Sequence, residues 1–310
     1  MHHAINRGVG ALPHLAILAM LLGGFTDQAR AAEAFASIFF PPAVGDEDPD
    51  LEGIIQIDLE TGSASTFIPL GTAGLDSPTD VAIHPQTNDL FVSTQTGRVL
   101  YFDSFGGAPL PSLVPGEPDG TFAVLPNAGF GDGVNTLHFD DDGTLVIGTS
   151  FGFIASYNGT TGASLPDLGF TTFPSGLDRA PNGDLIVAAA ISPFGAPGEL
   201  LSIDSVGATT VLVDSTDNPG IFDSANPTVV YAPGDYDRSG LVDSADYDVW
   251  EAAFGTFDPA ADGNFDTVVD AADYTVWRDN LGAEARILVA DLFTNRIMSS
   301  ARLFHLTQSS

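Results

Sequence analysis

The sequence predicts a mainly β fold made of repeated antiparallel units, with one small helical module inserted near its C-terminal end. Two observations predict the β units: short runs of β-branched and aromatic residues alternate with Gly, Pro, Asn and Asp from Ala34 onward, and apolar residues at helical spacing are nearly absent there. A third observation predicts the module. Over residues 234–282 the composition becomes strongly acidic, and a twelve-residue pattern occurs twice.

The first 31 residues have the three regions of a secretory signal peptide. Arg7 provides the positive charge, residues 15–22 (LAILAMLL) the apolar run, and residues 29–31 (Ala-Arg-Ala) the cleavage site. The apolar run is shorter than the roughly 20 residues that span a bilayer. We therefore expect residues 1–31 to be removed, no integral membrane segment to remain, and the protein to be secreted, extracellular or held at the cell surface. The alternative is an ordinary buried N-terminal helix.

Composition excludes several classes of function. The chain has 41 acidic and nine basic residues, a formal net charge of −32, and no cysteine. The missing cysteines exclude disulfides, zinc-thiolate sites and cysteine nucleophiles. A surface this acidic repels phosphate backbones, so we expect no nucleic-acid partner. It suits divalent cations or a salty medium instead.

A strand, turn, strand, strand pattern recurs three times within residues 80–204. Its second strands begin at Leu90, Leu145 and Leu185, which are 55 (145 − 90) and 40 (185 − 145) residues apart. Spacings of this size are typical of repeated four-stranded sheets, which bury their faces by stacking radially around an axis. Gly53–Asp58 with Ala64–Ile68 is the pattern of an earlier unit, and residues 218–232 begin a later one.

These units resemble the blades of β-propellers of the NHL or gluconolactonase-like kind. The resemblance implies a β-propeller of about five to six blades over residues 32–232. Residues 286–297 repeat the strand pattern, so residues 284–310 are expected to close the propeller, with the acidic module (residues 233–283) inserted in its last blade. A β-sandwich shares the same alternation and stays open, as does a C-terminal segment with no fixed place.

The repeated acidic pattern has the spacing of a calcium loop. In residues 235–246 and 262–273, oxygen-bearing side chains occupy loop positions 1, 3, 5, 9 and 12, and position 7 offers a backbone carbonyl. Calcium needs about 6–8 oxygen ligands, which this spacing supplies. We therefore expect two Ca²⁺ sites. The expected ligands are Asp235, Asp237, Ser239, Leu241, Asp243, Asp246, Asp262, Asn264, Asp266, Val268, Asp270 and Asp273.

The two loops differ at position 6, where the chain turns sharply. The first loop has Gly240 there and the second has Thr267. A β-branched residue in the left-handed region is strained, so we expect the second loop to bind calcium more weakly or to turn differently.

Each loop is followed by the same tail, Tyr-x-Val-Trp, and then by a glycine, Gly255 or Gly282. The tails predict helices over residues 246–254 and 273–280, each ended by its glycine. Two loop-and-helix segments with Asp at position 12 and no entering helix resemble a dockerin type I domain. The resemblance implies that loop positions 10 and 11 contact a partner, a cohesin-like protein or an extracellular polysaccharide assembly. These positions are Ser244, Ala245, Ala271 and Ala272.

The combined expectation is a secreted calcium-binding protein that works in attachment or assembly, with no catalytic residue nominated. The alternative is an extracellular hydrolase or lactonase acting on sugars, part of polysaccharide catabolism. Asp80 and Asn135 would then face a central channel; each precedes its anchoring leucine by ten residues, as Ser175 does. A structural surface protein without a defined partner is the third class. His84 and His138 adjoin apolar strands and are expected to be ordinary strand-edge residues.

Overall fold

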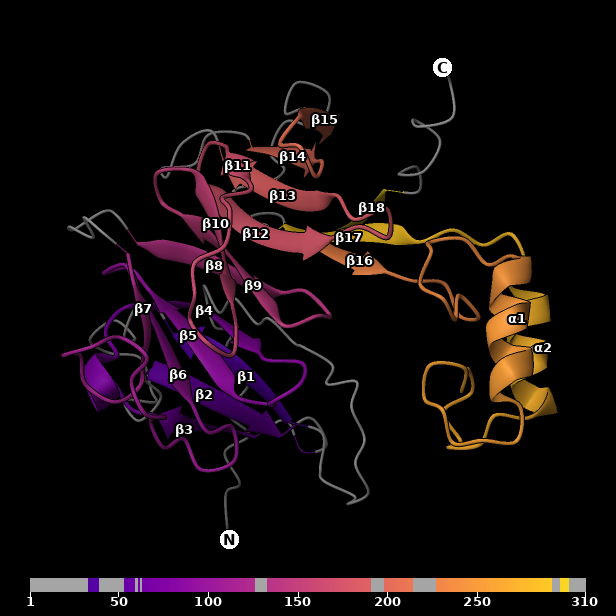
Figure 1. The fold of residues 1–310 in the computed structure, drawn as a ribbon, viewed down its shortest axis with the longest axis horizontal. Coiled ribbons are helices and arrows are strands. Elements are labelled where there is room, and N and C mark those ends of the chain that lie inside the picture. The colour runs from indigo at the N-terminus through magenta and orange to yellow at the C-terminus, as the bar shows by residue number, and fades with distance from the viewer. Residues whose placement is uncertain are drawn as a thin grey trace, which may run out of the picture.

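The structure, a computed structural model, describes residues 33–38, 53–58, 61, 63–125, 133–190, 198–213, 227–291 and 296–300. The expected signal peptide, most of the unit expected to begin at residue 218, and residues 301–310 lie outside the described residues. The described part of the chain is mainly β, with five antiparallel sheets and two α-helices (Figure 1). None of its helices is long and apolar enough to cross a bilayer.

Four of the five sheets are formed by strands that follow one another directly in the chain. Sheet 1 contains β1 (Glu33–Ile38), β2 (Gly53–Asp58) and β3 (Ala64–Ile68). A short 3-10 helix, η1 (Thr72–Gly74), leads to sheet 2, which contains β4 (Pro78–Ile83), β5 (Leu90–Thr94), β6 (Arg98–Phe102) and β7 (Thr121–Val124). Sheet 3 contains β8 (Val134–Phe139), β9 (Thr144–Thr149), β10 (Phe153–Asn158) and β11 (Gly169–Phe170). Sheet 4 contains β12 (Pro174–Arg179), β13 (Leu185–Ala190), β14 (Gly198–Ile203) and β15 (Thr209–Val213).

The fifth sheet is interrupted in the sequence. It contains β16 (Pro227–Val230), β17 (Arg286–Asp291) and β18 (Arg296–Ser300). β16 and β17 pair antiparallel with Val230 opposite Arg286, so residues 231–285 leave and re-enter between two hydrogen-bonded neighbours. Figure 1 shows the two helices of this segment, α1 (Ser244–Ala253) and α2 (Ala271–Asp279), side by side and away from the sheets.

The sheets stack so that the middle ones bury both faces. The first strands lie next to one another in the order β1, β4, β8, β12, β16. In β5, Leu90 and Val92 pack with sheet 1, whereas Phe91 between them packs with sheet 3. In β13, likewise, Val187 packs towards sheet 3 and Ile186 towards sheet 5. Burial on both faces explains why these strands have continuous apolar runs in place of alternation.

The first strands of sheets 2, 3 and 4 share a bulge. The register of the ladder shifts at Thr79 in β4, Asn135 in β8 and Ser175 in β12. The Thr79 hydroxyl donates to the carbonyl of Val134, and Asn135 Nδ2 donates to the carbonyl of Pro174 at 3.3 Å. The bulge side chains of β4 and β8 therefore join these strands to the first strand of the next sheet, whereas the Ser175 hydroxyl donates to the carbonyl of Ala188 in its own sheet at 3.1 Å.

The alignment of Asp80 with Asn135 and Ser175 is wrong. In sheet 2 Ile83 pairs with Leu90, seven residues on, but in sheet 3 Phe139 pairs with Leu145, six residues on. The turn between the first two strands is thus one residue longer in sheet 2. Since side chains alternate along a strand, this one-residue shift gives Asp80 a different position from Asn135.

Gly148 is expected to be essential for the contact between sheets 3 and 4. A Cβ at this position would lie 2.7 Å from Cγ of Pro174 and 2.8 Å from Cγ2 of Thr136. Gly148→Ala should therefore lower the free energy of unfolding by about 1–3 kcal/mol, measured by urea unfolding. Gly106→Ala is the matched control, because its nearest neighbour is the flexible carboxylate of Asp103 at 3.2 Å. Equal losses in the two variants would contradict the assigned contact.

Candidate metal centre

The first acidic loop is folded by its own carboxylates. Asp235 Oδ2 accepts from the N–H of Gly240 at 2.9 Å, and Asp246 accepts from Asp237 N–H at 3.0 Å and Asp243 N–H at 2.8 Å. Gly240 has a φ of 90°, a conformation open to glycine without strain. This turn brings the side chains of positions 1, 3 and 12 together. Asp235, Asp237 and Asp246 each offer one oxygen, and these three atoms lie within 4.8 Å of one another.

One oxygen in this cluster is buried without a partner. The Asp235 residue is only 7% exposed, and its Oδ1 accepts no hydrogen bond. Burial, and next the nearby Asp246, raises the pKa of Asp235 to about 6. A buried carboxylate oxygen with no donor is costly, whereas a bound cation would satisfy it. The orphaned atom and the three converging oxygens therefore fit a cation.

The donor set fits a hard cation such as calcium. Besides the three carboxylates, the first loop offers the hydroxyl of Ser239, the carbonyl of Leu241 and the carboxylate of Asp243. Every one of these donors is an oxygen, as Ca²⁺ prefers, and none is a nitrogen or sulfur. The Ser239 hydroxyl lies 3.2 Å from the Leu241 carbonyl oxygen, so positions 5 and 7 are neighbours in space.

The second loop repeats these hydrogen bonds 27 residues later (262 − 235). Asp262 Oδ2 accepts from Thr267 N–H at 2.8 Å, and Asp273 accepts from Asn264 N–H at 3.1 Å and Asp270 N–H at 2.7 Å. One difference concerns position 1, since Asp262 Oδ1 also accepts from Asp266 N–H at 3.1 Å. Within the described ranges, a close group of three acidic side chains occurs only in the first loop.

The turn of the second loop carries the expected strain. Thr267 has a φ of 77°, and Phe265 before it has a φ of 60°. The corresponding residues of the first loop, Gly240 and Arg238, are also left-handed, at 90° and 55°. The two loops thus share one backbone path, which glycine adopts freely and threonine only at a cost. Weaker binding by the second loop stays a prediction.

Both helices begin two residues earlier than the sequence predicted. The reason is a capping box in each: Asp243 and Asp270 are the N-caps, and the N3 residues Asp246 and Asp273 bond back to them. The aspartate at loop position 12 is therefore both a candidate ligand and part of the helix start. The four residues expected at the partner surface lie exposed in the first helical turns: Ser244, Ala245, Ala271 and Ala272.

The two halves of the module are joined by contacts that sequence reasoning missed. The indole N–H of Trp250, on α1, donates to the carbonyl of Asp270 in the second loop at 2.9 Å. The indole N–H of Trp277, on α2, donates to the carbonyl of Asp243 in the first loop at 2.6 Å. The repeated tail placed a tryptophan on each helix, but only the fold shows that each indole reaches the opposite loop.

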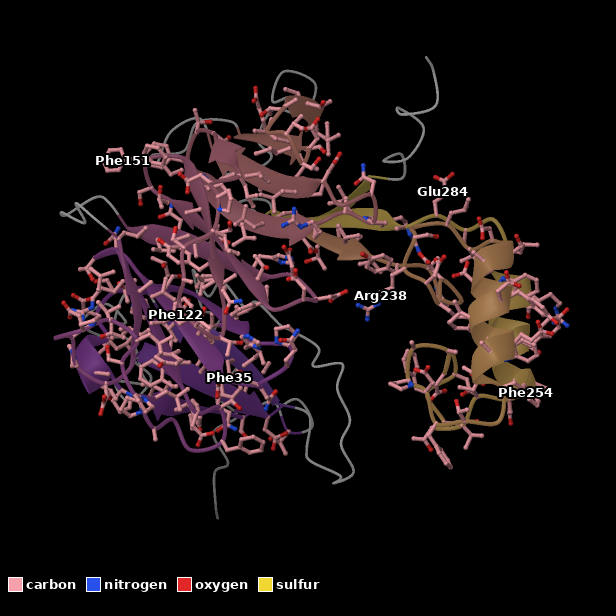
Figure 2. The ribbon with its side chains drawn as sticks, in the orientation of Figure 1. Phe35, Phe122, Phe151, Arg238, Phe254 and Glu284 are labelled. Atoms are coloured by element: carbon pink, nitrogen blue, oxygen red, sulfur yellow. The ribbon has the colours of Figure 1, made fainter. Side chains whose placement is uncertain are left out.

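The module also touches the sheets. Arg238, at loop position 4, lies 3.3 Å from the carboxylate of Asp141 and has its guanidinium 5.7 Å from the ring centroid of Tyr231. Figure 2 shows Arg238 on the side of the module that faces the sheets. Both charged side chains are well exposed, so this ion pair contributes little stability by itself.

The residues considered for a sugar-hydrolysing site bond other strands. Asp80 is buried and accepts from the N–H groups of Val81 at 2.8 Å and Leu137 at 2.9 Å. Asn135 donates to Pro174 in the next sheet and accepts from the Ser150 hydroxyl. Both side chains are thus engaged in holding the sheets together.

The two histidines in the described sheets differ in setting. His84 is buried, and its Nδ1 accepts from the N–H groups of Gln86 and Thr87 at 3.2 Å each. His138 lies between two carboxylates, 3.4 Å from Asp140 and 3.7 Å from Asp178. A simple strand-edge role therefore understates His138, which bridges the first strands of sheets 3 and 4. His305 lies outside the described residues.

No protein-family model and no curated protein matches the chain. Solved structures similar to it include three proteins. The extracellular domain of the one-component system BT4673 from B. thetaiotaomicron is 14% identical, with 60% of this chain and 22% of that chain covered and a TM-score of 0.39. Saccharomyces cerevisiae Sqt1 is 14% identical, with 66% and 50% covered and a TM-score of 0.43. A protein described as a gluconolactonase is 13% identical, with 58% and 64% covered and a TM-score of 0.37.

The matches therefore cover less than two thirds of each of these solved chains. Similarities at this level carry no activity, ligand or partner over to this chain.

The buried carboxyl of Asp80 is expected to give the fold a pH dependence. Burial raises the pKa of Asp80 to about 6, although the N–H groups of Leu137 and Val81 act in the opposite direction. Its unfolded pKa is about 3.9. Below about pH 3 the carboxyl is protonated in both states. As the pH rises towards 6 only the unfolded state ionises, so stability falls, by roughly 2–3 kcal/mol in total.

The difference in unfolding free energy between wild type and Asp80→Asn isolates this effect. An amide does not titrate, so the variant lacks the contribution of the Asp80 carboxyl to the pH dependence. Urea unfolding between about pH 4 and pH 7 should show wild type losing stability relative to the variant. Parallel curves would contradict the assigned titration.

Proposed function

We propose that residues 234–282 form a dockerin-like calcium-binding module on a β-propeller scaffold, and that the protein works in attachment or assembly outside the cell. The observation that carries the proposal is the buried, unpartnered Oδ1 of Asp235 beside the carboxylates of Asp237 and Asp246. A divalent cation would pair this oxygen and relieve the repulsion among the three carboxylates.

The duplication of the loop supports calcium over chance acidity. The hydrogen bonds at positions 1, 3, 9 and 12 recur in both halves, from Asp235 to Asp246 and again from Asp262 to Asp273. An ordinary solvated turn would not be expected to repeat the same set of carboxylate hydrogen bonds in two separate loops. The two-loop pattern with Asp at position 12 also resembles that of dockerin type I domains.

The place of the module in the chain supports a role in presentation. It leaves sheet 5 after β16 and returns at β17, so both of its ends are held by paired strands. Four exposed residues lie in the first turns of α1 and α2: Ser244, Ala245, Ala271 and Ala272. We propose that this surface meets a cohesin-like protein or an extracellular polysaccharide assembly.

The propeller is proposed for the sheets because each one packs its first strand against the next. This is how blades pack around an axis, and it needs both faces of every middle sheet to be apolar. Export is proposed from the signal-peptide pattern of residues 1–31. We favour attachment over sugar hydrolysis because Asp80 and Asn135 hold strands together.

Calcium binding is tested by titrating the full chain with Ca²⁺ in a calorimeter and by tryptophan fluorescence. Trp250 and Trp277 are the only tryptophans, so the fluorescence reports on the module alone. We expect saturable binding, and Asp235→Asn should weaken it at least about tenfold, because a charged and buried ligand is lost. Asp248→Asn is the matched control: the same change on an exposed residue of α1 outside both loops should leave the affinity unchanged.

Chelation should destabilise the module and spare the sheets. At a calcium concentration about 100 times the Kd, binding stabilises the folded form by about 2.7 kcal/mol, which chelator removes. Hydrogen exchange should then speed up in residues 234–282 and stay slow in β5, β9 and β13. Wild type that shows neither heat nor a change in fluorescence with Ca²⁺ would refute the proposed function.

A further inference from the structure

We propose that the two loops bind calcium as a coupled pair, in which ordering of the first loop prepares the second through reciprocal indole–carbonyl hydrogen bonds. The inference rests on the proposed calcium function and concerns the regulation of that same site. It predicts that the strained second loop gains its affinity from the first.

The two crossing bonds are related by the repeat. Trp250 donates to the carbonyl of Asp270 at 2.9 Å, and Trp277 donates to the carbonyl of Asp243 at 2.6 Å. Asp243 and Asp270 occupy loop position 9 and are also the N-caps of their helices. Each indole therefore holds the point at which the opposite loop turns into its helix.

Further contacts cross between the halves near the ligands. Tyr236, next to the ligand Asp235, donates its hydroxyl to the carbonyl of Asp273 at 2.8 Å. Asp273 occupies position 12 of the second loop. A Cβ on Gly263 would lie 2.4 Å from the Tyr236 hydroxyl, so the glycine in the second loop makes room for this crossing.

The backbones cross as well. The N–H of Val242, at position 8 of the first loop, donates to Ala283 beyond α2 at 2.9 Å. In the other half, the N–H of Val269 donates to Thr256 beyond α1 at 3.0 Å. Each loop is thus bonded to the end of the opposite helix as well as to its tryptophan, so a loop does not order alone.

The loops differ in what they gain from an ion. In the first loop, calcium would satisfy the orphaned Oδ1 of Asp235. In the second, Asp262 Oδ1 already accepts from Asp266 N–H, and Thr267 is held at a φ of 77°. The first loop therefore binds first. Asp246, held by an ion in the first loop, would fix the start of α1, and Trp250 on α1 would then hold Asp270 in place for the second site.

Coupling of this kind is reciprocal: whatever the first ion adds to the second site, the second ion adds to the first. It requires no large movement, because ordering shared residues once lowers the entropy cost of the second binding event. The indoles are kept in place by tilted and edge-to-face ring contacts. Tyr247, Trp250, Tyr274 and Trp277 form a cluster whose ring centroids lie 5.3–6.1 Å apart.

The test replaces each indole by a ring that cannot donate. In calorimetric titrations of the full chain with Ca²⁺, wild type should bind two ions in one steep transition. Trp250→Phe and Trp277→Phe should split it into two stages, with the second stage weakened about fivefold, since one hydrogen bond is lost. Tyr247→Phe is the control in the same cluster, because its hydroxyl lies 3.4 Å from the exposed Glu251 and touches neither loop.

A double-mutant cycle assigns the effect to the indole. Asp237→Ala, in the first loop, should weaken binding by the second loop about fivefold in wild type and leave it unchanged in Trp250→Phe. Two independent sites in wild type, a single bound ion, or the same result in Trp250→Phe as in Tyr247→Phe would each overturn the coupling while leaving calcium binding intact. No binding at all by wild type would instead refute the proposed function.

Hydrogen exchange provides a second readout that needs no variant. With one equivalent of Ca²⁺ per chain, coupled loops should gain protection together in residues 235–246 and 262–273. Protection of the first loop alone would overturn the proposal even if the tryptophan variants failed to fold.

Discussion

The constraint on which this structure depends is that its middle sheets must bury both faces. Phe91 and its neighbours Leu90 and Val92 point to opposite sides of one strand, and each side is covered by a different sheet. A sheet with two apolar faces is stable only between two others. The serial stacking along β4, β8 and β12 follows from this requirement. It also leaves the connections between strands as the places where an insertion disturbs no core, and the acidic module occupies one of them.

Polar groups in the sheets serve the same stacking. Asp80 accepts an N–H from β8, Asn135 donates to β12, and Asp178 accepts the N–H of Val229 in β16 at 2.6 Å. Burial raises the pKa of Asp178, as it does that of Asp80. A buried carboxylate is tolerated where backbone donors satisfy it. These residue types could have indicated a catalytic site, but their partners here are the backbones of neighbouring sheets.

The module differs from the sheets, since it has only a small apolar core for its two acidic loops. Its buried apolar residues number few, among them Ala253, Ala261 and Val269. The two indole–carbonyl hydrogen bonds join the halves, and the two capping boxes fix where each loop turns into its helix. Because Asp246 and Asp273 both start a helix and are proposed ligands, ordering of the helix and binding of an ion would be one event. The ion would then be part of the fold.

The sequence by itself determined whatever depends on local spacing. Alternation of apolar runs and turns was enough to predict repeated antiparallel units. The 27-residue repeat from Asp235 to Asp262 was enough to predict paired loops. Both predictions were possible because strand period and ligand spacing depend on residues that are near one another in the sequence. Only the tertiary structure decided the rest. The offset of Asp80 depended on a turn one residue longer, the helix starts on cap bonds, and the indole contacts on how two helices pack. The indole contacts join residues 20 and 34 positions apart, and the folded backbone sets their distance in space.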